Sequence, residues 1–566
     1  MENRKLLYNV LISQDIIRGY SRKGISPRCL LKIDLQKAFD SVRWSFLNQL
    51  LHSLRFPHVF IEWIMACLRA TSFTIHINGQ TGQSFKAERG LKQGDPLSPL
   101  LFVIVMECFS RQMKKLSSQQ YAFHPGCKAL KLTHLMFADD LLIFCKAQPS
   151  TLSSIMRVLN EFHECSGLQA NQTKSQAIYG GCNSTTIEAC NQITGFREGG
   201  LPLKYLGITL SSSRLTKIEC RALVDKITMK VKQWSSRSLS FAGRAQLLNS
   251  VIFGMYSYWA NIFILPHEVI ELINKICRNF LWGGNADYNK IPYISWQSTC
   301  LPKKHGGIGL KNLTAWNTAC IAKLVWGIAK KKDQLWIKWI HHRYLKENDW
   351  WTYKAKPDCS WYWRKIVKVK DQFLAWKQHM DQRTYKVSLG YSWLIGEQPT
   401  YFWAKAVWAR ASLPRHSFIS WVFMHQRLPV LSRIAKFTSS YQNTCSMCSR
   451  EEEDLNHLFF QCSWSKDFWK ILHTWWPSSI SYLSHQDFLH SLQRLRGAKT
   501  WKQTTYAILM AGIYHIWATR NLKKYKNKQL PAHTVFTQLK NQIIQRVLLL
   551  AKHNHRYWQY IDSTLR

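Results

Sequence analysis

Two adjacent aspartates in an apolar stretch are the residues of this chain best suited to chemistry. Asp139 and Asp140 follow apolar residues 135–137 and precede apolar residues 141–144. Charged carboxylates in a run typical of a buried strand are costly unless a cation compensates them. Because neighbouring strand residues point to opposite faces, only a tight hairpin turn brings both acids to one site. The pattern indicates carboxylates around hard divalent metal ions, although an Asp pair also marks ordinary turns.

Three further pieces accompany this acid pair. Asp34 ends an alternating apolar pattern at residues 30–33, and a helix-like segment follows it. A loop rich in Gly and Pro at residues 89–99 leads into an apolar helix, and its glycines let a backbone approach a base pair or sugar closely. Residues 166–175 then contain Lys174, a candidate proton donor or phosphate ligand.

In this order the pieces resemble motifs A to E of the reverse transcriptase palm, in the form found in plant LINE-type (non-LTR) retrotransposons. The five pieces are residues 30–40, 89–100, 137–140, 166–175 and 203–210, the last expected as one short strand. A lone Phe-Ala-Asp-Asp is unspecific, whereas five pieces in this order are specific. Residues 242–244, 280–283 and 304–310 also resemble the segment that follows the polymerase core in these elements.

The resemblance implies nucleotidyl transfer with two Mg²⁺ ions, which lie roughly 3.5–4 Å apart in such sites. Asp34 and Asp139 would be the principal metal ligands, with Asp140 a weaker third. Lys174 would neutralise or protonate the departing pyrophosphate as a general acid. The implied partners are an RNA template, a DNA primer or target, and deoxynucleoside triphosphates (dNTPs).

Three more residues would contact these substrates. Phe39, five residues after Asp34, would lie beneath the incoming sugar and exclude a ribose 2′-hydroxyl, although a core aromatic is the plain alternative. Gln93 and Gly94 would contact the template base and the incoming nucleotide. Asp95 is expected to have a structural role, at a turn or helix entry before a proline.

A second candidate metal site has a different chemistry. Its ligands would be Cys445, Cys448, His457 and Cys462, with the spacing C-x2-C-x8-H-x4-C. Thiolates and imidazole suit one structural Zn²⁺ in a closed tetrahedral site. Most of the other thiols among the sixteen cysteines are expected to be free core cysteines. The pattern resembles the zinc-binding domain appended to plant LINE reverse transcriptases. Its expected small apolar core is Trp421, Trp464, Phe468 and Trp469.

The composition points to a polyanionic partner. Lys and Arg number 77 against 33 Asp and Glu, a formal net charge of +44 in 566 residues. This excess disfavours an ordinary metabolic enzyme and favours nucleic acid, because cations that neutralise phosphates release counterions. The best apolar run, residues 100–106, is far short of the about 20 residues needed to cross a bilayer. Without a signal-peptide pattern, we expect reduced thiols and a nuclear or cytoplasmic location, with protein partners unspecified.

The expected fold class is an α/β polymerase palm of the right-hand type, with its fingers largely missing. A mainly α-helical thumb and connection and a small zinc-stapled domain would follow. The expected domains are a partial palm at 1–210, a helical thumb-like region at 211–330, a basic Trp-rich connection at 331–395, a zinc-binding domain at 396–480 and a helical basic tail at 481–566. Ile218, Leu223, Ile227, Val231 and Trp234 have helical spacing in the thumb-like region.

Two functions remain open at this stage. Met1 lies only 33 residues before Asp34, whereas the family has fingers and an endonuclease upstream. We therefore expect an N-terminally truncated RNA-directed DNA polymerase of a non-LTR retrotransposon, with a competent palm site and weak or no activity alone. The alternative is a non-catalytic, zinc-containing nucleic-acid-binding remnant. A group II intron maturase shares the palm but lacks this zinc pattern.

Overall fold

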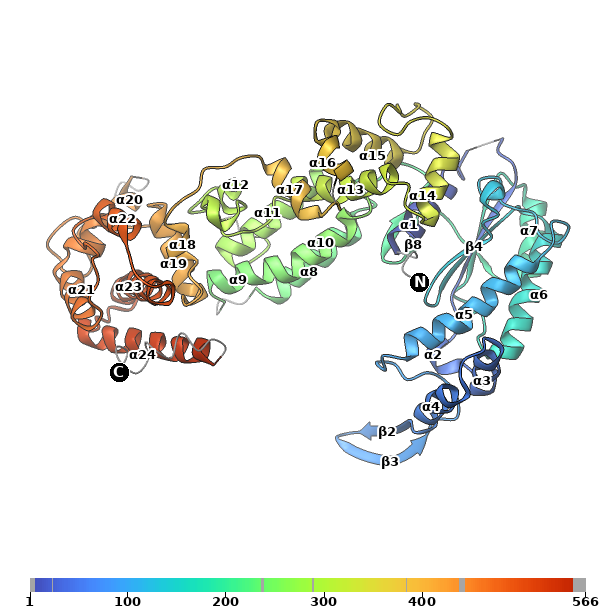
Figure 1. The fold of residues 1–566 in the computed structure, drawn as a ribbon, viewed down its shortest axis with the longest axis horizontal. Helices are drawn as coiled ribbons and strands as arrows, with labels where there is room; N and C mark the ends of the chain where they lie inside the picture. Colours follow the sequence, from blue (N-terminus) through green and yellow to red (C-terminus); the bar gives the residue numbers. More distant parts are fainter. Residues whose placement is uncertain are drawn as a thin grey trace. The chain divides into compact units, whose positions relative to one another are not determined.

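The structure, a computed structural model, describes residues 6–22, 24–235, 239–287, 290–382, 384–436 and 443–552 (Figure 1). The chain forms two compact units. The first comprises Met1–Cys220, Asn261–Ile264 and Cys320–Tyr385, and the second comprises Arg221–Ala260, Leu265–Ala319 and Lys386–Arg566. In the described part of the chain, no helix is both long and apolar enough to span a bilayer.

A five-stranded sheet of order β4-β5-β1-β6-β7 forms the centre of the first unit. Its strands are β1 (Arg28–Ile33), β4 (His134–Phe137), β5 (Asp140–Cys145), β6 (Gln176–Gly180) and β7 (Arg197–Glu198). β1 pairs antiparallel with both β5 and β6, whereas β6 and β7 are parallel. The middle strands are buried and almost wholly apolar, as expected of strands covered on both faces. The predicted α/β layer is therefore confirmed.

Helices precede the first strand of this sheet and connect the later ones. They are α1 (Leu6–Ile16), α2 (Ala38–Ser41), α3 (Trp44–Ser53), α4 (His58–Arg69), α5 (Ser98–Lys115), η1 (Lys128–Leu130), α6 (Pro149–Ser166) and α7 (Ser184–Thr194). Leu31 and Ile33 of β1 share one core cluster with Phe109 of α5 and Phe162 of α6. α1 contacts the edge strand β4, where the side-chain amide of Asn9 donates to a backbone carbonyl at 3.0 Å.

Two hairpins complete this part of the chain. β2 (Ser72–Ile77) and β3 (Gln80–Lys86) form an exposed antiparallel pair. β8 (Leu203–Tyr205) and β9 (Ile208–Leu210) form the other pair. The prediction of one short strand at 203–210 is therefore wrong. Leu206 and Gly207 both adopt positive φ angles and turn the chain back on itself, as two-residue hairpin loops require.

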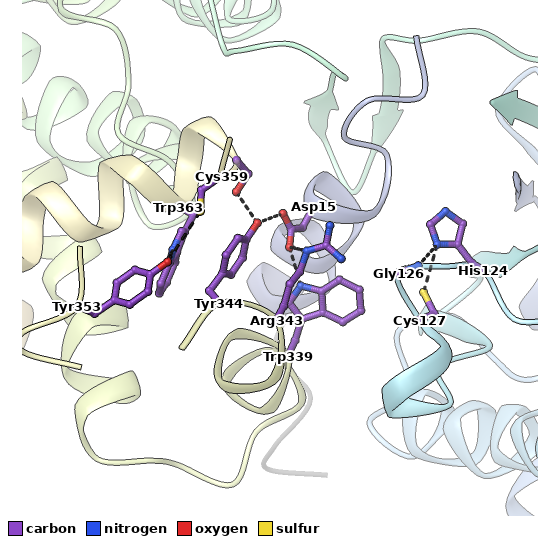
Figure 2. A network of polar contacts seen from close by, with 11 residues as sticks. Asp15, His124, Gly126, Cys127, Trp339, Arg343, Tyr344, Tyr353, Cys359 and Trp363 are labelled. Atoms are coloured by element: carbon purple, nitrogen blue, oxygen red, sulfur yellow. Dashed lines mark hydrogen bonds and ion pairs between the residues drawn. The ribbon is translucent and has the colours of Figure 1, made fainter. Parts of the chain in front are cut away.

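The basic Trp-rich segment is helical and belongs to the first unit as far as residue 385. It follows α13 (Leu313–Ala329) and contains α14 (Leu335–Ile340), η4 (His341–Leu345), α15 (Trp361–Gln372), η5 (Leu374–Trp376) and α16 (Lys377–Gln382). Figure 2 shows how it is held to α1: the indole of Trp339 donates to the buried carboxylate of Asp15 at 2.7 Å, and Arg343 pairs with it at 3.1 Å. The Tyr344 hydroxyl also donates to Asp15. The rings of Trp350 and Trp363 are buried, as expected for most aromatics here.

In the described part of the second unit the regular elements are helices, and one isolated β-bridge joins Thr444 to Glu452. After α8 (Arg221–Gln233) come α9 (Phe241–Leu247), η2 (Leu248–Ile252), α10 (Phe253–Ala260), α11 (His267–Gly283), α12 (Trp296–Thr299), η3 (Lys303–His305), α17 (Val387–Ile395), α18 (Ala404–Val407), α19 (Pro414–Met424), α20 (Leu431–Ala435), η6 (His457–Gln461), α21 (Ser463–Trp475), α22 (His485–Arg494), α23 (Lys499–Lys526) and α24 (Ala532–Ala551). Leu223, Ile227 and Val231 of α8 are buried, as their spacing predicts. Ile218 is 80% exposed, because α8 begins three residues after it.

Two buried histidines should make the second unit sensitive to acid. Burial lowers the pKa of His416 to about 3 and that of His515 to about 4. Both folded-state values lie below the unfolded value of about 6.5, so the unfolded chain binds protons first as the pH falls. We expect stability to be lost from pH 6.5 downward, by about 1.5 kcal/mol per histidine at pH 5.5. Urea unfolding between pH 7.5 and 5.5 measures this slope.

The control for this slope is a histidine in the same unit that is exposed. His515→Gln should reduce the pH dependence, whereas the exposed His267→Gln should leave it unchanged. Equal slopes for the wild type and His515→Gln would contradict the assignment.

Candidate active site and zinc centre

The three candidate metal-binding acids lie at one end of the first unit's sheet. Asp34 directly follows β1 and Asp140 opens β5, and these strands are paired with Ile33 opposite Leu141. Asp139 lies in the two-residue turn between β4 and β5, since Phe137 pairs with Asp140. Ala138, the other turn residue, has a φ of 52°. The tight hairpin turn predicted from the sequence is therefore present.

The acids influence one another electrostatically. The pKa of Asp140 is raised, first by burial and then by the negative charges of Asp139 and Asp34, while Lys32 opposes the shift. Mutual repulsion of this kind is relieved when a cation binds, and carboxylate oxygens are the donors that Mg²⁺ prefers. Lys32 was missed by the sequence reasoning. Its signal is the strand period of two, which puts it on the same face as Asp34.

The loop that carries Lys174 is fixed to Asp34. The Asn171 N–H donates to the Asp34 carbonyl at 2.7 Å, and the Asp34 N–H donates to the Ser175 hydroxyl at 3.2 Å. The Asn171 side chain also accepts from the Lys174 N–H at 3.2 Å. These bonds place the Lys174 ammonium 3.9 Å from the Asp34 carboxylate, with the lysine side chain 70% exposed. An ion pair as exposed as this one adds little stability. Its significance is that it holds the Lys174 ammonium beside the Asp34 carboxylate.

The Gly/Pro-rich loop is bound to the segment that follows Asp34. Gly90 has a φ of 90°, and a Cβ there would lie 2.7 Å from the Asp40 carbonyl oxygen. Its carbonyl accepts from the Trp44 indole at 2.7 Å, and the Leu91 N–H donates to the Phe39 carbonyl at 2.7 Å. Only glycine tolerates this approach.

The candidate substrate-contacting residues differ in their surroundings. Phe39 is half-buried and stacks on Phe102 with ring centroids 4.8 Å apart. Gln93 and Gly94 are exposed in the loop, and a Cβ at Gly94 would meet nothing within 4 Å. The Asp95 carboxylate accepts from a backbone N–H at 2.8 Å, which confirms its expected turn. The structure thus brings the three acids and Lys174 together, with Phe39 tied to the adjoining loop.

The second candidate site gathers its four ligands closely. The ligand atoms of Cys445, Cys448, His457 and Cys462 all lie within 4.8 Å of one another. Cys448 Sγ is 3.2 Å from His457 Nε2. The Cys445 thiol donates to Cys462, which lowers the pKa of Cys462 and raises that of Cys445. Three sulfurs and one imidazole in a closed cluster are the donor set of a structural zinc site.

Acidic neighbours orient this cluster. Glu451 Oε2 lies 2.8 Å from His457 Nδ1, so it favours the tautomer that turns the Nε2 lone pair toward the sulfurs. Glu453 is fully buried and forms an ion pair with Arg520 of α23 at 2.5 Å, while also accepting from the Leu431 N–H at 3.0 Å. The sequence reasoning missed both glutamates, although they stand in a run of three between the ligands. The cluster consequently folds together with a helix beyond residue 480.

The aromatic core expected here is divided between two clusters. Trp464 stacks on Phe468 at 5.5 Å, and Phe468 contacts Trp469 at 5.7 Å. Trp421 is also buried, but its ring packs 6.3 Å from that of Trp282 on α11. The aromatic support next to the ligands thus comes from three residues of α21, Trp464, Phe468 and Trp469.

Comparison with known proteins assigns both regions. Residues 7–210 match the family described as reverse transcriptase (RNA-dependent DNA polymerase). Residues 385–469 match the family described as zinc-binding in reverse transcriptase. The first unit thus contains a polymerase palm fold, and the predicted resemblance is confirmed at the level of the family. The chain belongs to the reverse transcriptases.

Similar curated proteins define the type more closely. The chain is 31% identical over 462 residues to a Pol polyprotein of the type-1 retrotransposable element R2 from Nasonia vitripennis, covering 78% of this chain and 41% of that protein. It is 25% identical over 314 residues to the R2DM Pol polyprotein of Drosophila melanogaster, covering 53% and 28%. It is 23% identical over 327 residues to the transposon TX1 149 kDa protein of Xenopus laevis, covering 54% and 23%. The chain is of the non-LTR retrotransposon type, and it spans less than half the length of each of these relatives.

Proposed function

We propose that the first unit performs RNA-directed DNA synthesis by two-metal nucleotidyl transfer. The observation that carries this proposal is the position of Asp34, Asp139 and Asp140 at the ends of paired strands, inside the region that matches the reverse transcriptase family. Asp34 and Asp139 would be the principal Mg²⁺ ligands and Asp140 the weaker third. Bound Mg²⁺ would supply Lewis-acid activation of the primer hydroxyl and charge neutralisation at the leaving pyrophosphate.

The remaining site residues would act on the substrates. Lys174, anchored beside Asp34, would neutralise the pyrophosphate and donate a proton to its leaving oxygen. Gln93 and Gly94 would contact the template base and the incoming nucleotide from the open part of their loop. An RNA template and a DNA primer fit the net charge of +44.

The zinc-binding domain would have a structural role. Cys445, Cys448, His457 and Cys462 would hold one Zn²⁺ with all four tetrahedral positions taken by protein. The ion would join the 445–448 turn to α21, and Glu453 with Arg520 would join both to α23.

A second candidate function is binding of nucleic acid without catalysis. It is favoured by the net charge of +44. Primer extension on a primed RNA template, with dNTPs and Mg²⁺, separates the two. The assay is run on the chain and on a chimera that carries a relative's preceding segment ahead of residue 1. Extension supports the polymerase, and nucleic-acid binding without extension in either protein supports the alternative.

Phe39 provides a test of sugar selection. Phe39→Val removes the ring proposed to lie beneath the sugar, so ribonucleotides should enter the product about tenfold more readily relative to dNTPs, a change of about 1.4 kcal/mol. The ratio of kcat/KM for the two nucleotide types measures this. Phe46→Val is the control, because it removes another half-buried ring of the same unit. Unchanged selectivity in Phe39→Val would refute the role.

A further inference from the structure

The second unit contains a pocket of about 600 Å³ that the palm site and the zinc centre do not use. It is formed by α9, the glycine-rich loop at 306–310, and the segment that leads into α19. Its most chemically distinctive lining residues are Lys303, Lys311, Tyr391, Trp408, Arg410 and Ser412. A concave site of this volume suits a ligand the size of one or two nucleotides rather than a duplex.

All the charged residues that line the pocket are positive. Lys303, Lys311 and Arg410 line it, and none of its described lining residues is acidic. These three cations form no ion pair within the part of the chain that the structure describes. Next to the lining residue Arg410, the Arg546 guanidinium donates to the Arg410 carbonyl at 3.1 Å. Uncompensated cations at a concave surface raise the local concentration of anions.

Aromatic rings accompany these cations. Lys303 Nζ lies 4.7 Å from the ring centroid of Trp408, and Lys311 Nζ lies 4.9 Å from that of Tyr391. A phosphate drawn to Lys303 would bring its attached base to the partly exposed Trp408 ring, whereas the Tyr391 ring is buried. Ser412 is 6% exposed, and its hydroxyl has no hydrogen-bond partner among the described residues. Alternating rings and cations are the usual means of binding single strands.

The pocket wall is preformed. A Cβ at Gly307 would lie 2.0 Å from the Leu301 carbonyl oxygen, so this position requires glycine. The Gly306 carbonyl accepts from the Trp421 indole at 2.7 Å, which fixes the start of the loop. On the opposite wall, the Arg410 N–H donates to the Gln503 side chain at 2.7 Å. A wall fixed before binding reduces the entropy lost when a ligand is taken up. Close packing against Leu301 therefore explains why the 304–310 motif has glycine at position 307.

We propose that this pocket binds single-stranded nucleic acid. Backbone phosphates contact Lys303, Lys311 and Arg410, and a base stacks against the partly exposed ring of Trp408. The site is independent of polymerase catalysis, because none of its residues belongs to the palm.

Photocrosslinking of the full chain locates the bound strand. Oligonucleotides of eight 5-iodouridine or eight 5-iododeoxyuridine nucleotides are irradiated with the protein. The crosslinked peptides are then identified by mass spectrometry. We expect crosslinks at Trp408, and the RNA and DNA arms decide which strand is preferred. The palm variant Asp139→Asn should give the same pocket crosslinks, so failure of the polymerase proposal leaves this one standing. Crosslinks found only outside the pocket in both arms would overturn it.

Variants test the two components of the site. Trp408→Leu should weaken binding of the same oligonucleotides about tenfold, and Trp408→Phe should restore most of the affinity, because any aromatic face can stack. Combining Lys303→Gln, Lys311→Gln and Arg410→Gln should reduce the slope of log K against log salt by about 2. The matched control combines Lys275→Gln, Lys470→Gln and Arg494→Gln, three exposed cations of the same unit outside the pocket. Equal slopes for the two triple variants, with both folded by circular dichroism, would refute the charge component.

Discussion

Asp139→Asn is expected to lower deoxynucleotide incorporation by about a thousandfold or more. Asn keeps the volume of Asp but removes the negative charge, so the loss is electrostatic rather than steric. A metal that stabilises developing charge contributes several kcal/mol, and each 1.36 kcal/mol is tenfold in rate. Asp139 lies exposed in the β4–β5 turn, where the substitution removes no buried contact. Single-nucleotide extension of a primed RNA template measures the effect in the chain and in the chimera described above.

Asp40→Asn is the matched control for this change. Asp40 is also exposed and lies in α2, six residues after Asp34, and it should keep full activity. Mn²⁺ binding followed by electron paramagnetic resonance gives a second readout that does not require turnover, and only Asp139→Asn should weaken it. If Asp139→Asn extends primers as well as Asp40→Asn does, the catalytic assignment fails. A well-folded chimera without activity would contradict it equally.

The catalytic end of the palm could be predicted because its pattern is local. Alternation before Asp34 and the apolar runs around Asp139 and Asp140 encode strands and a turn within a few residues. Which strands pair is not local. The pairing of β1 with β5 and β6 depends on segments more than a hundred residues away, and so does the hold of Asn171 on Asp34. The arrangement of these strands was therefore expected from the resemblance to the family and not from hydrophobic periodicity.

The partners of buried charged residues were even harder to predict from the sequence. Asp15 stands in an apolar helix, and nothing nearby in the sequence indicates what compensates it. Its partners Trp339 and Tyr344 lie 324 and 329 residues further on. Glu453 similarly finds Arg520 at a separation of 67 residues. Such pairs form only when distant segments pack, which is why a zinc domain bounded at 480 omitted Arg520.

The zinc ligands were predictable for the opposite reason, since all four stand within eighteen residues. Their spacing alone restricts which metal geometry the chain can form. The supporting contacts of Glu451 and Glu453 were not predictable, because the four consecutive acidic residues 451–454 are equally typical of a solvated loop.

Removing zinc is expected to unfold the 443–475 region and lower the unfolding midpoint of the second unit. The free energy of binding at structural zinc sites is about 10–16 kcal/mol and is largely folding free energy. Purified full chain should contain about one Zn per molecule by elemental analysis, and chelation should expose this region to protease. Cys448→Ala should have the same effect, because three ligands hold the ion far more weakly than four. Buried Glu453 and Arg520 should then lose the packing that keeps them paired.

Cys277→Ala separates metal binding from simple packing. Cys277 is 6% exposed in α11 of the same unit and is not a ligand, whereas Cys448 is only partly buried. If packing determined stability, Cys277→Ala would be the more damaging change, since it removes a buried side chain. If zinc determines it, Cys448→Ala loses the metal and unfolds the region while Cys277→Ala keeps both. A full chain that is folded, metal-free and indifferent to chelators would refute the zinc site. The reverse ranking of the two variants would show that the thiols act only as core residues.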